Sequence, residues 1–176
     1  MEIEQILRSK MKPKEKQTEL VEALISKKLD VWDFVLFFES ASEVDKGTCA
    51  DVIKNVTKSA PALFIPFVDI LVNYINYKAP RVKWGIPEAI GNMAKDFPDK
   101  AEKAIPFLLQ NISDDAQNTT VIRWCASYAL TEIAKYNVKT RKQLIPIFEK
   151  AILEEKNNGV RNVFVKALKT IEKRSL

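Results

Sequence analysis

A forty-residue repeat restricts what this chain can fold into more than any other feature of its sequence. The tripeptides Ile65-Pro66-Phe67, Ile105-Pro106-Phe107 and Ile145-Pro146-Ile147 follow one another at intervals of forty residues. A second motif in the same register occurs as Val82-Lys83-Trp84, as Ile122-Arg123-Trp124 and as Val160-Arg161-Asn162. Self-similarity at about 40–47 residues is typical of proteins built from stacked helix pairs. The sequence therefore predicts an all-α fold in which helix pairs form a superhelix (solenoid).

The spacing of apolar residues predicts two helices, A and B, in each unit. The third unit has apolar residues at i, i+4, i+7, i+8 and i+11, which form one face of an α-helix. These residues are Ile122, Ala126, Ala129, Leu130 and Ile133. No linker divides the chain, so we expect one domain over residues 1–176. It would comprise an N-terminal helical cap at 1–28 and four helix pairs at about 30–58, 61–96, 98–136 and 138–174.

Three features together resemble the HEAT-repeat family of armadillo-like proteins. They are the proline inside helix A, the Val/Ile-Arg/Lys pair that opens helix B, and the Ala-Leu-x-x-Ile that ends it. The match covers about residues 45–174 and is strongest over 98–136. The resemblance implies a right-handed α–α superhelix, a bend in helix A at each proline, and B helices that line the concave surface.

The same resemblance implies a ladder of acidic and basic residues along the stack. The residues that match its basic half are Lys46, Lys83, Arg123 and Arg161. The acidic half is irregular, and the residues that could supply it are Asp114 or Asp115, Glu155, and in the second unit only Asn73 or Asn76. A ladder along the whole stack is therefore doubtful on the sequence alone.

The composition argues against an enzyme. The chain has no histidine, which removes the commonest general base and the commonest zinc ligand. Its two cysteines, Cys49 and Cys125, lie far apart on apolar helix faces, where we expect them to be buried. The four glycines form no phosphate-binding loop. We therefore expect no catalytic residues, no metal site and no cofactor.

Charge and hydropathy bear on location and partners. The first residues do not resemble a targeting peptide, and the most apolar stretch, 60–75, is too short and too interrupted to cross a membrane. We therefore expect a cytoplasmic protein. The net charge of +5 arises entirely in residues 140–176, which hold nine basic and four acidic side chains. This basic end is either a polar cap on the last repeat or a surface for an acidic partner or a phosphate backbone.

The outward face of the B helices is the candidate binding surface. Alignment of the repeats places Trp84 and Trp124 in one column, with Glu88, Tyr128 and Lys166 one helical turn further on. We expect Trp84, Trp124 and Tyr128 to form an aromatic cluster across two units. The candidate partner-binding residues are Lys83, Trp84, Glu88, Arg123, Trp124, Tyr128, Arg161 and Lys166. The alternatives are that the tryptophans fill space between helices and that the basic residues belong to a structural ladder.

The sequence is consistent with three functions, and the first two are better supported than the third. The first is a non-enzymatic scaffold that binds a protein partner, since aromatic and Arg anchors are enriched at binding hot spots. The second is nucleic-acid binding, similar to helical-repeat DNA-binding proteins such as the alkylpurine glycosylases, with Lys169 among the phosphate contacts. The third is a cofactor-handling lyase on a HEAT scaffold. We expect a monomer or a part of a larger complex.

Pro87 breaks a local rule, because it falls inside the predicted second B helix. A proline in a helix interior costs about 3 kcal/mol relative to alanine. Either this helix is locally strained beside Trp84, or it begins late with Pro87 in its first turn.

Overall fold

The structure is a computed structural model that describes residues 2–113 and 118–175, the last without its side chain. Those residues form helices and connections with no β-strand, which confirms the predicted all-α class. Asp114 and Asp115, two of the predicted ladder residues, lie outside the described residues.

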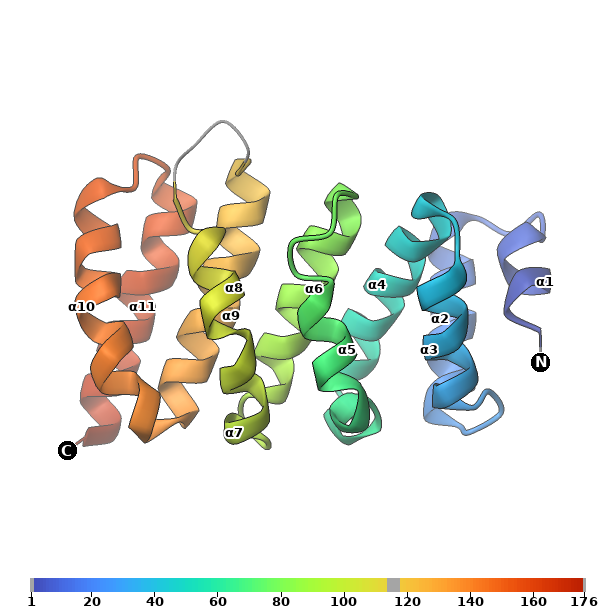
Figure 1. Ribbon diagram of the computed structural model, residues 1–176, viewed down its shortest axis with the longest axis horizontal. Helices are drawn as coiled ribbons and strands as arrows, with labels where there is room; N and C mark the ends of the chain where they lie inside the picture. The colour runs from blue at the N-terminus through green and yellow to red at the C-terminus, as the bar shows by residue number, and fades with distance from the viewer. Residues whose placement is uncertain (1, 114–117, 176) are drawn as a thin grey trace.

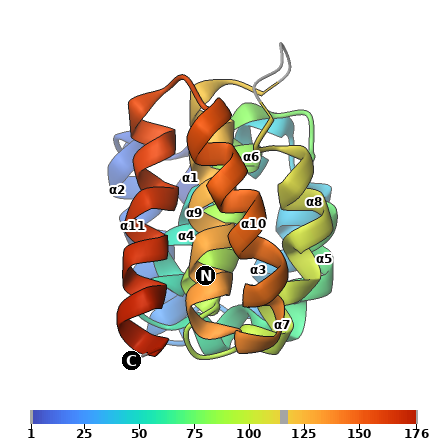
Figure 2. The same ribbon diagram turned by 90° about the vertical axis from the view of Figure 1, so that its left-hand side faces the viewer.

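The helices stand side by side in a row that is two layers deep (Figures 1 and 2). The B layer contains α2 (Pro13–Ile25), α4 (Glu43–Thr57), α6 (Pro80–Met93), α9 (Thr120–Tyr136) and α11 (Asn158–Ser175). The A layer contains α3 (Val31–Ser40), the 3-10 helix η1 (Pro61–Phe67), α5 (Val68–Asn73), α7 (Pro98–Ala101), the 3-10 helix η2 (Glu102–Ala104), α8 (Ile105–Gln110) and α10 (Val138–Glu154). Helix α1 (Ile3–Arg8) lies at the N-terminal end of the row, opposite α11 (Figure 1). We call the surface of the B layer that points away from the A layer the B face.

Small residues let neighbouring B helices approach closely. A Cβ atom added to Gly85 would lie 2.8 Å from the carbonyl oxygen of Ala50 on α4, so only glycine fits there. On α9, Ala126 and Ala129 are fully buried. The core is thus a continuous strip between the layers, and each B helix is fixed against the next.

Four helices of the row begin where a short polar side chain satisfies the first backbone N–H groups. Asp30 accepts hydrogen bonds from the N–H groups of Trp32 and Asp33 at the start of α3. Equivalent caps begin three later helices, with Ser42 at α4, Thr119 at α9 and Asn137 at α10. Such caps typically stabilise a helix by about 1 kcal/mol, and two of them, at α4 and α9, fix where a B helix begins.

The three A-helix prolines do not have the same effect. Pro66 lies in η1, and Pro106 lies in the first turn of α8, where A helices are divided into 3-10 and α segments. Pro146 lies inside α10, which continues for 17 residues. All three are exposed, so the ring faces solvent in each case. The proline removes one backbone hydrogen bond, and in α10 the rest of the helix continues around it.

Pro87 lies inside α6, which extends without interruption from Pro80 to Met93. Pro87 therefore falls inside this helix as predicted, and the alternative that the helix begins late, with Pro87 in its first turn, is wrong. Its first turn is instead occupied by Pro80, a position where a missing N–H costs nothing. Pro87 is buried, and its ring fills part of the core.

Both cysteines are free and buried, as predicted. Burial raises the pKa of the Cys49 thiol to about 12 and also raises the pKa of Cys125. Because a thiol reacts as the thiolate, both side chains behave as small apolar groups.

Candidate partner-binding surface

Arg123 is a structural residue rather than a surface contact. Its guanidinium makes two hydrogen bonds to the carboxylate of Glu155, at 2.8 and 3.1 Å, and donates a third to the carbonyl oxygen of Asn118 at 2.8 Å. The two charged side chains are only 7% and 4% exposed. Burial alone would raise the pKa of Glu155, but hydrogen bonds from Arg123 and from the N–H of Asn157 lower it on balance. Glu155 thus supplies one rung of the predicted ladder.

Lys46 occupies the same column of the repeat and is also buried, but without a carboxylate partner. Its ammonium donates hydrogen bonds to the carbonyl oxygens of Phe38, Glu39 and Ala41, at 2.7–3.0 Å. These carbonyls lie at the C-terminal end of α3, where a cation is favoured by the helix dipole. Burial lowers the pKa of Lys46.

The other two members of this column are more exposed. Lys83 is half-buried, and its side chain makes no hydrogen bond or ion pair with a described residue. Arg161 is half-buried and donates to the side chain of Asn158 within its own helix. Both cations remain accessible to a partner.

Trp124 and Tyr128 form the aromatic centre of the B face. Their rings stack with centroids 5.8 Å apart and an interplanar angle of 3°. Trp124 is 37% exposed. The arrangement presents a flat aromatic surface on α9 that is open to solvent.

Tyr128 is held rigidly by α6. Its hydroxyl donates a 2.8 Å hydrogen bond to the side chain of Asn92, which in turn donates to Thr57 and to the carbonyl oxygen of Lys54. A Cβ at Gly91 would lie 2.8 Å from the Tyr128 ring, so the ring rests directly on the α6 backbone. Burial raises the pKa of Tyr128 to about 12, so the hydroxyl stays protonated and remains a donor. Trp124 therefore stacks on a fixed support.

Trp84 does not join this pair. Its ring makes no aromatic contact among the described residues. The prediction that Trp84 belongs to the aromatic cluster is therefore wrong. The indole is half-buried, and its Nε1 is enclosed without a hydrogen-bond partner in the described part of the chain. Trp84 is thus partly enclosed and stands apart from the stacked pair.

Four charged side chains of α4 and α6 neutralise one another. Asp51 accepts hydrogen bonds from Arg81 at 2.5 and 3.2 Å and lies 3.5 Å from the ammonium of Lys54. Lys54 also lies 3.8 Å from Glu88, whose carboxylate accepts a 3.6 Å contact from the thiol of Cys125. Glu88 is thus engaged inside a neutral network across three helices. These four groups therefore attract neither anions nor cations strongly.

The exposed face of α11 is different. Lys166, Lys169 and Lys173 lie at i, i+3 and i+7 of this helix, with Asn162 one turn before them, and all four side chains are exposed. We call the three lysines the α11 lysine row. None of them forms an ion pair with a described residue. In the repeat register Lys166 occupies the column of Tyr128 one repeat further on, so the lysine row lies on the helix next to the open aromatic pair.

Several residues of this surface were not among the predicted site residues. Gly91 and Asn92 support Tyr128, and Lys173 extends the row that begins at Lys166. The helical spacing of Lys166, Lys169 and Lys173 was a signal that sequence reasoning could have used for that row. Nothing in the local sequence around Gly91 indicates that a tyrosine from the next repeat lies on it.

Two classes of feature are missing from residues 2–113 and 118–175. No group of three or more Cys, Asp or Glu side chains is placed to hold a metal ion. No helix there is both long enough and apolar enough to cross a membrane.

Comparison of the chain with protein-family models, with curated proteins and with solved structures found no match in any of the three.

Proposed function

We propose that the chain is a HEAT-like right-handed superhelix and acts as a non-enzymatic scaffold that binds a segment of a protein partner on its B face. Support for the repeat architecture comes from the row of paired helices, the forty-residue register and the Arg123–Glu155 rung between units. The free thiols of Cys49 and Cys125 suit work in a reducing compartment such as the cytoplasm.

The observation that carries the binding proposal is the stacked pair Trp124 and Tyr128. A tryptophan that is 37% exposed leaves apolar area in water, although its neighbours hold it in one position. A rigid aromatic anchor loses little conformational entropy when it binds, and such residues dominate the energetics of protein interfaces. A partner side chain placed on Trp124 would remove that area from water.

The proposed contact set differs from the predicted one. Its centre consists of Trp124, Tyr128 and Lys166. At its edge are two accessible cations, Lys83 and Arg161. Arg123 is excluded because Glu155 and Asn118 occupy its guanidinium, while Glu88 and Trp84 serve the internal network and the packing.

The test is selection of peptides from a random display library on the immobilised full chain. A matched pair of variants decides the outcome: Trp124→Ala on the B face and Trp32→Ala on α3, where Trp32 is 57% exposed on the other layer. We expect enriched peptides that bind wild type and Trp32→Ala but lose at least tenfold in affinity for Trp124→Ala. Peptides that bind Trp124→Ala as well as wild type would contradict the proposal.

A second candidate is single-stranded nucleic acid, and the observation that favours it is the lysine row beside an exposed indole. Lysines can neutralise phosphates while a base stacks on tryptophan. Fluorescence anisotropy with labelled single-stranded DNA, RNA and duplex at about 50 and 200 mM salt tests it, because phosphate contacts weaken steeply with salt. Micromolar binding that Trp124→Ala removes would support this candidate, and no binding at the lower salt would exclude it.

A further inference from the structure

We propose that the partner segment is acidic, with carboxylates that contact Lys166, Lys169 and Lys173 while an apolar side chain of the same segment lies on Trp124. This inference rests on the proposed function, since it names the chemistry of the segment that the B face would bind.

The charge balance within the B face supports this proposal. Lys54 and Arg81 are each within 3.5 Å of Asp51, and Lys135 is 2.5 Å from Glu132. Arg174 folds back over the ring of Tyr136 and donates to the carbonyl oxygen of Lys135. The three lysines of the α11 row have no such partner among the described residues. Their charge is therefore available to an incoming anion.

The position of the α11 lysine row also supports the proposal. Lys166 corresponds in the repeat register to Tyr128, and Asn162 corresponds to Trp124. Helices α9 and α11 are direct neighbours in the B layer (Figure 2). A segment that crosses from α9 to α11 would therefore meet the aromatic pair first and the cations next. A segment that contacts both the aromatic pair and the lysine row therefore needs apolar and acidic side chains close together.

The dimensions of the row and the charges around it favour an acidic segment over a polynucleotide. From Lys166 to Lys173 the row is about 10.5 Å long, at 1.5 Å per residue. An extended peptide covers that length with about three residues, and carboxylates at alternate positions are about 6.7 Å apart. Beyond the row, on α9, α6 and α4, the cations Lys135, Lys54 and Arg81 are already paired with Glu132, Glu88 and Asp51, so they offer little to a longer polyanion. The surface thus favours a short anionic stretch.

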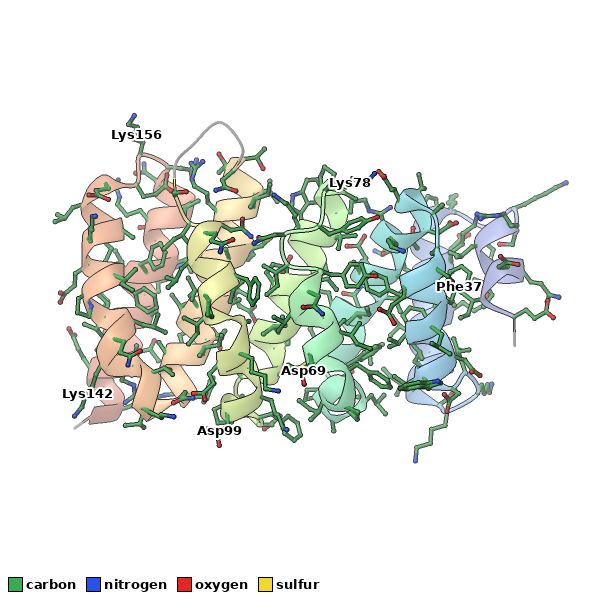
Figure 3. The ribbon with its side chains drawn as sticks, viewed as in Figure 1. Phe37, Asp69, Lys78, Asp99, Lys142 and Lys156 are labelled. Atoms are coloured by element: carbon green, nitrogen blue, oxygen red, sulfur yellow. The ribbon has the colours of Figure 1, made fainter. Side chains whose placement is uncertain are left out.

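The experiment is an anisotropy titration of the full chain with a labelled synthetic peptide of about twelve residues that contains one Phe followed by alternating Glu. A peptide with Lys in place of each Glu and one with Ser in place of Phe are the ligand controls. The decisive variant is Lys166→Glu/Lys169→Glu. Its matched control is Lys139→Glu/Lys142→Glu on α10, which changes the net charge equally on the other layer, where Lys142 projects into solvent (Figure 3).

We expect the Glu peptide to bind wild type and the α10 variant equally and the α11 variant at least about tenfold more weakly, with the difference reduced by salt. The Lys peptide should not bind. Equal loss in both double variants, or binding of the Lys peptide, would overturn the inference.

The result also separates the two proposals. If peptides selected through Trp124 are neutral or basic and bind the α11 variant normally, the acidic-segment inference fails while the proposed function stands. If single-stranded DNA competes the Glu peptide off at equimolar concentration and binds more tightly, the occupant is a nucleic acid and both proposals fail.

Discussion

The two halves of the B face carry similar residue types but use them differently. On α4 and α6 the cations Lys54 and Arg81 bind carboxylates of the protein itself, whereas Lys83 makes no ion pair with a described residue. On α9 and α11 the stacked pair of Trp124 and Tyr128 is open to solvent, and the lysine row has no partner among the described residues. The comparison teaches that a basic residue on this face is available to a partner only where no neighbouring group of the protein has engaged it.

The largest effect should come from the buried pair that joins the third and fourth repeats. Glu155→Ala removes the carboxylate that accepts two hydrogen bonds from the buried guanidinium of Arg123, and loss of one partner of such a pair typically costs about 3–5 kcal/mol. The adjacent Glu154→Ala, which removes an exposed carboxylate 3.7 Å from Lys150, should cost less than about 1 kcal/mol. Urea denaturation of the two variants measures both. Equal free energies of unfolding would show that burial of the pair is irrelevant.

The same pair should make stability depend on pH. The pKa of Glu155 is lower in the folded chain than its unfolded value of about 4.3, so its contribution is present above that pH and is lost as the pH falls. The difference in unfolding free energy between wild type and Glu155→Gln, on the order of 1.5–3 kcal/mol at pH 7, should therefore shrink towards pH 3. Contributions of other carboxylates cancel in this difference. A difference that stays constant or grows as the pH falls would contradict the assignment.

A smaller effect should follow from Gly91→Ala. The new Cβ would lie 2.8 Å from the Tyr128 ring and 3.0 Å from the Cα of Ala129. Overpacking of this kind costs about 1–3 kcal/mol, and the better helix propensity of alanine returns about 1 kcal/mol. We expect a net loss of about 1 kcal/mol, together with altered tryptophan fluorescence and weaker peptide binding. A variant with wild-type binding would show that Tyr128 need not be fixed.

The smallest effect on stability should come from the α11 row. Lys166→Glu/Lys169→Glu changes exposed side chains without partners, so its unfolding free energy should stay within about 0.5 kcal/mol of wild type. The same variant is the one expected to lose binding of the acidic peptide. A loss of several kcal/mol in unfolding free energy would show that these lysines are bound by other groups of the protein, as Lys54 and Arg81 are.

The sequence predicted the all-helical fold and the burial of both cysteines, because apolar periodicity and residue type are local properties. It also named Glu155 as a possible acidic rung, which the structure pairs with Arg123. It was misleading for Trp84, since a repeat column says which face a residue lies on and not how far the next helix covers it. Lys46 shows the same limit, because its partners are carbonyl oxygens that no sequence motif reveals.

The most direct test of the account uses the indole N–H signals of the chain's three tryptophans, Trp32, Trp84 and Trp124, in a nitrogen–proton correlation spectrum. Addition of the Phe-Glu peptide should shift the signal of Trp124 and leave that of Trp32 unchanged, with the same shift absent in Lys166→Glu/Lys169→Glu. Assignment follows from the single Trp→Phe variants. A peptide that shifts Trp32 and leaves Trp124 in place would contradict the account, because the partner would then occupy the A layer.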